Sequence, residues 1–156
     1  METSRFTFKA NVSDFDLWDS YLSQYEIAFT KGMASGAMCS YFAPNGDSCC
    51  GNKFLLNGVI RGVWGRPDAV IMSDCSAVAN MMKNGAADGP LNASAKALNA
   101  GLDIYGGWND DLWTQGYLAQ AINASLSTVA TLDQTVTRTL LQKMKTGIYD
   151  PLAGQP

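Results

Sequence analysis

The sequence of 156 residues contains no histidine. Without histidine there can be no Ser-His or Cys-His nucleophile pair, and the commonest general base of enzymes is missing. If the protein catalyses a reaction, its carboxylates are therefore the side chains that we expect to carry the chemistry.

Cysteine is scarce, with four residues, Cys39, Cys49, Cys50 and Cys75. They lack the paired CxxC spacing and the histidine partners of a structural zinc site, so we expect no metal centre and no cofactor. Buried free thiols are the simplest interpretation of the four cysteines. A disulfide formed in an oxidising compartment is the alternative.

Clustered positive charge is also absent. The formal net charge is −3, and the 11 Lys and Arg residues are scattered along the chain, so we expect no nucleic-acid partner. No apolar run is long enough to span a bilayer, so we expect no membrane contact. Localisation is left open, because the start METSRFTFKA lacks the order of a signal peptide. Three Asn-X-Ser sequons, at Asn11, Asn92 and Asn123, favour the secretory pathway.

Hydrophobic residues make up 47% of the chain, which suits one domain or part of one. Apolar periodicity predicts helices over residues 14–31, 52–62, 74–82, 92–100, 112–124 and 128–145, and short apolar runs predict strands over 36–41, 69–73 and 101–104. Strands separated by single helices indicate parallel βαβ units, in which functional residues gather at the carboxyl ends of the strands. Tyr41, Asp74 and Asp103 fall at such ends.

The stretch AVIMSDCSAV, residues 69–78, places a carboxylate directly after an apolar run that we expect to be buried. A charge is costly to bury without a partner, so Asp74 is a satisfied structural group, a helix cap or a reactive group in a pocket. Taken alone, the SDC tripeptide favours the cap, because Asp commonly precedes a helix.

Three longer runs resemble glycoside hydrolase family 3, the β-glucosidase and β-xylosidase group. GAMCSYFAPNGDSCCGNKFLL is similar to the family's MCSYNAxNGxPxCANxxLL. VIRGVWGRPDAVIMSDCSAV is similar to LRxxWGFxGYVVSDCxAV, and ALNAGLDI is similar to ALxAGxDL. The runs occur in the family's order and spacing. The segment RFTFKANVSDFDLWDSYL and the tail LLQKMKTGIYDP also resemble the family, so nearly the whole chain is covered.

The resemblance implies an α/β fold in which residues 1–156 form a single partial domain. That domain would be the carboxyl-terminal half of a TIM-type (β/α)8 barrel, with about three parallel strands and flanking helices. A half barrel leaves strand edges open, so we expect a marginal monomer that pairs with another copy or with a missing half barrel.

The resemblance also implies site residues. Asp74 matches the family's catalytic nucleophile, and Tyr41 matches a tyrosine close to the sugar at the cleavage site, although a buried Tyr with a satisfied hydroxyl is an equal alternative. For Asp103 we expect a structural carboxylate. Trp108 and Trp113 could form an aromatic platform for sugar, but we expect them to pack in the core or between helices.

Several family features are missing or changed. Phe42 stands where the family has Asn, Arg66 follows Trp64-Gly65, and Pro67-Asp68 precede the nucleophile strand, changes that would alter a loop and a subsite. The Lys-His-Phe motif, the Asp and Arg that hold the glycone, and the acid/base residue have no counterpart. We therefore expect a retaining hydrolase of β-linked xylosides, arabinosides or glucosides that is inactive as an isolated chain. The alternative is a catalytically dead fragment or a sugar-binding remnant.

Overall fold

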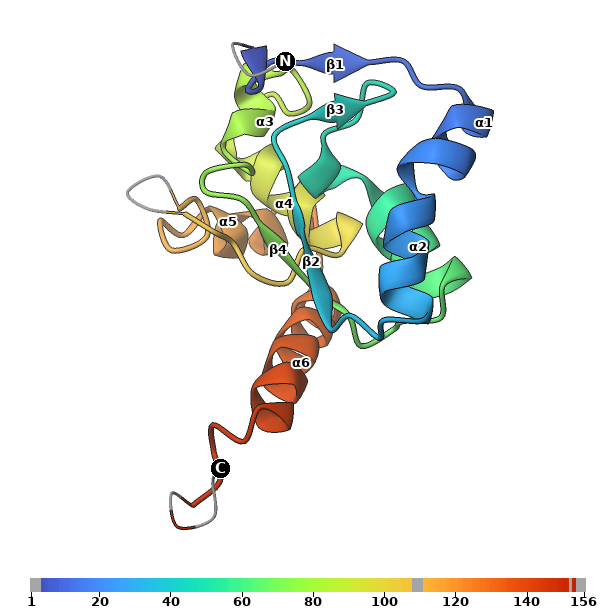
Figure 1. Ribbon diagram of the computed structural model, residues 1–156. Helices are drawn as coiled ribbons and strands as arrows, with labels where there is room; N and C mark the ends of the chain where they lie inside the picture. The colour runs from blue at the N-terminus through green and yellow to red at the C-terminus, as the bar shows by residue number, and fades with distance from the viewer. Residues whose placement is uncertain (1–3, 108–110, 152, 154–156) are drawn as a thin grey trace.

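The computed structural model describes residues 4–107, 111–151 and 153, and it is built around two short parallel ladders (Figure 1). Strand β2, Gly36–Cys39, pairs with β4, Val70–Ser73, in a parallel register that places Cys39 opposite Ser73. Strand β1, Lys9–Ala10, pairs with β3, Ala43–Pro44, also in parallel. Gly36 is required where β2 meets β4, because a Cβ atom there would collide with the Val70 carbonyl.

The strand expected over residues 101–104 is reduced to one parallel bridge between Met72 and Ile104. The reason lies in the residues just before it. Gly101 ends the preceding helix in the left-handed region with φ 100°, and the Ile71 carbonyl accepts hydrogen bonds from the N–H groups of both Asp103 and Ile104. The α/β arrangement with parallel strands is confirmed, but the third strand contributes only a single paired position.

The helices follow the expected pattern with two corrections. The helix expected over 14–31 is present as three joined segments: α1 (Asp14–Asp16), the π-helical η2 (Leu17–Tyr21) and α2 (Ser23–Thr30). The others are η3 (Cys49–Gly51), η4 (Phe54–Val63), α3 (Asn80–Lys83), α4 (Pro90–Ala100), α5 (Tyr117–Asn123) and α6 (Val129–Lys145). The corrections are α5, which begins five residues late, and α3, which is a fragment of the helix expected from Asp74.

The core lies on one side of the β2–β4 ladder. Cys39 and Ile71 are buried in a cluster with apolar residues of η4 and α4. On the other side of the ladder Met38 and Met72 are opposite each other and are 57% and 44% exposed. Within the described residues the sheet is therefore covered on one face only. No helix in this described part is long and apolar enough to cross a membrane.

A buried carboxylate attaches α6 to the sheet. Asp103 Oδ2 accepts hydrogen bonds from Arg61 Nη2 at 2.6 Å and Ile71 N at 2.8 Å, and Asp103 Oδ1 accepts one from Arg138 Nε at 2.7 Å. Burial raises the pKa of Asp103, and the two guanidinium groups oppose that shift. Burial also lowers the pKa of Arg61 to about 10, so this guanidinium stays charged at neutral pH. The structural role expected for Asp103 is confirmed.

The expected position of Asp103 at a carboxyl strand end was wrong. Its carboxylate accepts a hydrogen bond from the N–H of Ile71, the second residue of β4, and so lies before the carboxyl end of that strand. The strand predicted over 101–104 does not extend through Asp103. From this region α6 extends away from the other helices (Figure 1).

Candidate active site

Asp74 directly follows β4 and begins a tight turn. Its N–H donates to the Cys39 carbonyl at 2.9 Å, and its own carbonyl accepts from Ala77 N at 3.0 Å. Ser76, two residues later in the turn, is in the left-handed region with φ 61°, and its N–H donates to the Gly106 carbonyl at 2.7 Å. Backbone hydrogen bonds from two other segments therefore fix the position of the Asp74 Cα.

The turn rules out the capping role that the SDC tripeptide alone favoured. Helix α3 begins only at Asn80, and its N-cap is Ala79, with no side-chain cap. The Asp74 carboxylate instead accepts a hydrogen bond from Cys75 N at 2.6 Å. The helix expected to start at Asp74 is absent there, because the four-residue helix α3 begins six positions later.

Gly106 supports the same turn, a role that was not predicted from the sequence. Its N–H donates to the buried Ser73 Oγ at 2.7 Å, and an added Cβ atom would lie 2.5 Å from the Ser73 carbonyl oxygen. The pair Gly106-Gly107 after the last strand was the available signal, because glycine allows close approach of two backbones.

Tyr41 lies beside Asp74. It follows β2 by two residues, and its hydroxyl donates to the Cys75 carbonyl at 2.7 Å. Burial raises the pKa of Tyr41, and the negative charge of Asp74 and a hydrogen bond to its carboxylate raise it further, while Arg5 lowers it. The buried Asn84 donates to the Tyr41 carbonyl at 3.3 Å, which holds the backbone. The structure thus brings the two predicted site residues together.

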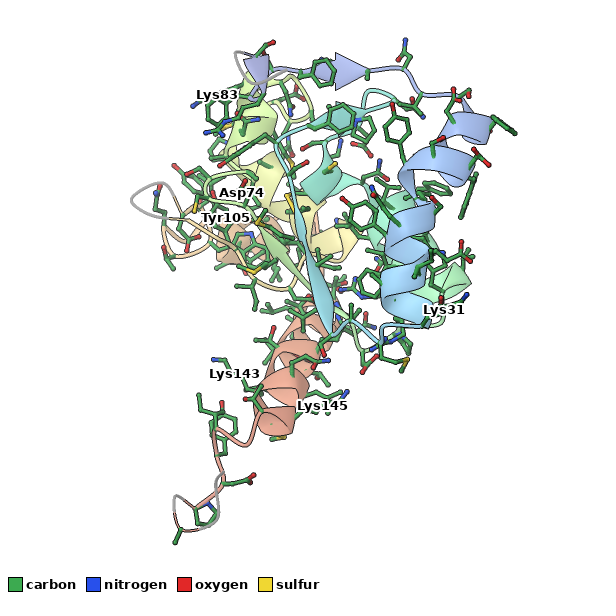
Figure 2. All side chains as sticks on the ribbon, in the orientation of Figure 1. Lys31, Asp74, Lys83, Tyr105, Lys143 and Lys145 are labelled. Atoms are coloured by element: carbon green, nitrogen blue, oxygen red, sulfur yellow. A yellow bond between two sulfur atoms is a disulfide. The ribbon has the colours of Figure 1, made fainter. Side chains whose placement is uncertain are left out.

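Both side chains line one groove of about 640 Å³. Its walls come from β1, β2, η2, α2 and η4 and are mostly apolar. Among the described residues that line it, Asp74 is the only carboxylate and Arg5 is the only cation. Figure 2 shows Asp74 at the end of β4, far from Lys31, Lys143 and Lys145. Among the described residues the groove therefore offers one carboxylate and one guanidinium in a mostly apolar setting.

The cysteines correct the free-thiol interpretation. Cys39 and Cys50 form a disulfide with their Cα atoms 5.1 Å apart, while Cys49 is half-buried and free, and Cys75 is exposed and free. Burial raises the pKa of the Cys49 thiol. The disulfide attaches the last residue of β2, whose carbonyl holds Asp74, to η3. In the described ranges no three His, Cys, Asp or Glu side chains form a metal-binding group.

Comparison with known proteins identifies the family. The family model described as "Glycosyl hydrolase family 3 N terminal domain" matches residues 8–141. The chain belongs to glycosyl hydrolase family 3. The match is to the family's N-terminal domain, and the expectation that the chain is the second half of a barrel stays a prediction.

Two similar curated proteins are β-xylosidases. Exo-1,4-beta-xylosidase bxlB of Emericella nidulans is 36% identical over 157 residues, which cover 98% of this chain and 20% of that protein. Beta-D-xylosidase 3 of Arabidopsis thaliana is 33% identical, with 94% of this chain and 18% of that protein covered. The chain therefore spans about a fifth of the length of the relatives it matches.

Solved structures of a β-xylosidase and a β-glucosidase share the fold. A GH3 exo-β-xylosidase in complex with a xylobiose aziridine activity-based probe gives a TM-score of 0.80 at 28% identity, covering 86% of this chain and 17% of that one. A β-glucosidase from Listeria innocua in complex with glucose gives a TM-score of 0.84 at 28% identity, covering 94% and 20%. These relatives are glycoside hydrolases that act on β-glycosides.

Of the departures from the family 3 motifs, only Phe42 reaches the groove, where its ring stacks on Phe8 with centroids 5.3 Å apart. Arg66 and Asp68 precede β4 and so lie at the opposite end of the strand from Asp74. Arg66 Nη1 donates to the Phe29 carbonyl at 2.9 Å, and Asp68 Oδ2 accepts from Lys145 Nζ at 2.6 Å. Their contacts lie away from the groove, and the expectation of an altered subsite stays a prediction.

The aromatic platform is not formed by Trp113. Its ring packs against Tyr105 with centroids 5.9 Å apart, and it is half-buried against the core. Trp113 therefore has the packing role that we expected. Trp108, the other tryptophan considered, lies outside the described residues.

Proposed function

We propose that this chain supplies the nucleophile of a retaining O-glycosyl hydrolase that acts on β-linked xylosides, arabinosides or glucosides. The observation that carries the proposal is the position of Asp74, which is the only described carboxylate in the groove and lies at the carboxyl end of a parallel strand. The activities named for the relatives, β-xylosidase and β-glucosidase, support the xyloside and glucoside part of this range.

In the proposed reaction one Asp74 oxygen attacks the anomeric carbon, and the glycosidic C–O bond breaks. The leaving oxygen takes a proton from a separate acid, and water later hydrolyses the glycosyl ester. In a retaining enzyme that acid lies about 5 to 5.5 Å from the nucleophile. Asp103 cannot serve, because both of its oxygens are bonded to arginines and it lies level with Ile71. The acid therefore comes from outside the described groove lining.

Tyr41 has a double role in this proposal. Its hydroxyl holds the Cys75 carbonyl and also lies beside the Asp74 carboxylate, close to where the sugar would bind. Tyr41 is thus a substrate-side residue that also fixes the turn of the nucleophile.

We further propose that residues 1–156 are the carboxyl-terminal half of a (β/α)8 barrel. The chain aligns with about a fifth of the length of each of two solved enzymes, at TM-scores of 0.80 and 0.84. In addition, Met38 and Met72 are exposed on one face of its sheet. A missing half barrel or a second copy would cover that face. A purified chain that stays monomeric at high concentration and unfolds cooperatively would contradict this.

The alternative is a catalytically dead fragment or a sugar-binding remnant. It is favoured by one observation, that no second carboxylate lines the groove among the described residues. Removal of an acid catalyst typically costs about 10² to 10⁴ in rate. For this reason we expect the isolated chain not to hydrolyse nitrophenyl β-xyloside or β-glucoside.

A substrate whose leaving group needs no proton separates the two proposals. A dinitrophenyl 2-fluoro-β-xyloside releases a stable anion, so the purified chain should be labelled covalently even without an acid. We expect one adduct, found by mass spectrometry on the peptide that contains Asp74. Asp74→Asn should abolish labelling, and Asp133→Asn, an exposed change on α6, should leave it unchanged. Labelling at another carboxylate refutes the assignment, and sugar binding without labelling supports the remnant.

A further inference from the structure

One tripeptide occurs twice in the sequence, and the fold presents its two copies differently. Asn-Ala-Ser, a sequon for N-glycosylation, occupies residues 92–94 and residues 123–125. We infer that Asn123 is a site of N-linked glycosylation in the folded chain and that Asn92 is not. The inference does not depend on the proposed function, because residues 123–125 do not line the groove that holds Asp74.

The modification joins a sugar chain to a side-chain amide. The amide nitrogen of Asn bonds to the anomeric carbon of an oligosaccharide that is carried on a lipid pyrophosphate. The bond from that carbon to the pyrophosphate oxygen breaks, the amide loses one proton, and the lipid pyrophosphate leaves. Because the sequon requires Ser or Thr two residues after the Asn, the transferase must reach that hydroxyl as well as the amide. An acceptor site therefore needs both groups exposed.

Residues 123–125 meet this requirement at the end of a helix. Asn123 is the last residue of α5, and Ser125 has left the helix with φ 59°. Both residues are exposed. Among the described residues, no hydrogen bond engages the Asn123 amide or the Ser125 hydroxyl. A transferase can therefore reach the amide and the hydroxyl together.

The backbone around this tripeptide is fixed by groups outside it. The Leu126 N–H donates to the Ala121 carbonyl at 2.9 Å, and the Leu126 carbonyl accepts from Asn99 Nδ2 at 2.8 Å. The side chains of Asn123 and Ser125 have no part in these bonds. A glycan on Asn123 would therefore leave the fold of the turn unchanged.

Residues 92–94 fail the same requirement because they lie inside α4. Residues two apart on a helix point to different faces. Asn92 is exposed, but Ser94 is 0% exposed, and its hydroxyl has no hydrogen-bond partner among the described residues. A transferase would reach that hydroxyl only if part of α4 unfolded.

The Cys39–Cys50 disulfide supports the encounter with a transferase. Disulfides form and persist in oxidising compartments such as the lumen of the endoplasmic reticulum. N-glycans are added in the same lumen, so a chain that forms this disulfide there is exposed to the transferase and to its lipid-linked donor.

The test compares the two identical tripeptides in the folded chain. Asn11→Gln first removes the third sequon, whose Ser13 hydroxyl takes part in the N-cap of α1. The purified chain of 156 residues is incubated with an oligosaccharyltransferase and an oligosaccharide on a lipid pyrophosphate, and peptide mass spectrometry follows each site. We expect modification of Asn123 to be at least about ten-fold faster than that of Asn92, because Ser94 becomes accessible only when α4 opens.

Peptides and serine variants separate the effect of the fold from that of the tripeptide. Isolated peptides of residues 86–100 and 117–131 should be modified at similar rates, because short peptides hold little helix in water. In the whole chain, Ser125→Ala should abolish the modification of Asn123, whereas Ser94→Ala should leave it unchanged. Circular dichroism checks that each variant is folded.

Two outcomes would overturn the inference: equal rates at Asn92 and Asn123 in the whole chain, or an unmodified Asn123 when the peptide of residues 117–131 is modified. Asn123→Gln should not affect the covalent labelling of Asp74, because residue 123 lies outside the groove. Failure of the glycosylation site and failure of the proposed function are therefore distinguishable.

Discussion

Replacement of Asp103 by Asn should be among the most damaging single changes in this chain. The Asp103 side chain is fully buried, and the side chains of Arg61 and Arg138 are 8% and 15% exposed. Asn has the same shape but no charge, and its amide nitrogen cannot accept the hydrogen bonds that one carboxylate oxygen now receives. The substitution therefore leaves at least one buried guanidinium without its counter-charge.

The expected loss is about 3 to 5 kcal/mol of the free energy of unfolding, the usual cost of removing one partner from a buried ion pair. Most of this cost falls on Arg61, whose Nε already lacks a hydrogen-bond partner among the described residues, whereas Arg138 can turn toward water. Urea unfolding followed by circular dichroism gives the free energy directly, and urea does not screen charges as guanidinium chloride does.

A matched pair of variants tests the electrostatic reasoning. Arg138→Met keeps the Arg61–Asp103 pair and should cost less than Asp103→Asn. The double variant Arg61→Met with Asp103→Leu removes both charges and should recover much of the stability. A loss below about 1 kcal/mol for Asp103→Asn, or a double variant less stable than the single one, would refute the account.

Three further changes test other parts of the site and fold. Gly106→Ala should cost about 1 to 3 kcal/mol in urea unfolding, because its Cβ atom would press on the Ser73 carbonyl and disturb the Asp74 turn; an unchanged midpoint would contradict this. Cys39→Ser should lower the free energy of unfolding by about 2 to 4 kcal/mol through loss of the disulfide with Cys50. If a reductant destabilised the variant as much as it destabilises the wild-type chain, loss of the disulfide would be excluded as the cause. Lys145 lowers the pKa of Asp68 below its ordinary value of 3.8, so this pair contributes stability above that pH and loses it as the pH falls through the lowered pKa. Because both groups are partly exposed, Lys145→Ala should cost less than about 1 kcal/mol at pH 7 and nothing at pH 2.

The elements that could be predicted from the sequence are those whose signal is local. β4 is a continuous apolar run, and α6 has apolar residues at helical spacing, so both were placed within one residue of their observed ends. The proximity of Tyr41 and Asp74 also followed from the sequence, because carboxyl ends of parallel strands meet at one edge of a sheet.

The features that could not be predicted depend on distant contacts. A helix was predicted to start at Asp74, but the chain forms a turn there, and this turn is fixed by a hydrogen bond from Ser76 N to the Gly106 carbonyl, 30 residues later. The cysteine count does not give pairing, and adjacent cysteines leave the partner of Cys39 ambiguous. Arg5 lacks any local signal, because its place in the groove depends on the pairing of the following strand β1 with β3.

The way the Asp74 turn is held has a consequence for mutational tolerance. The Asp74 N–H bonds to a carbonyl of β2, and the Ser76 N–H bonds to the carbonyl of Gly106. Carbonyl groups are present whatever side chain a residue carries, so most substitutions at Cys75 or on the groove walls leave these bonds in place. Selection could therefore vary the walls, and with them the sugar preference, while the carboxylate keeps its place; only the close contact at Gly106 restricts this freedom.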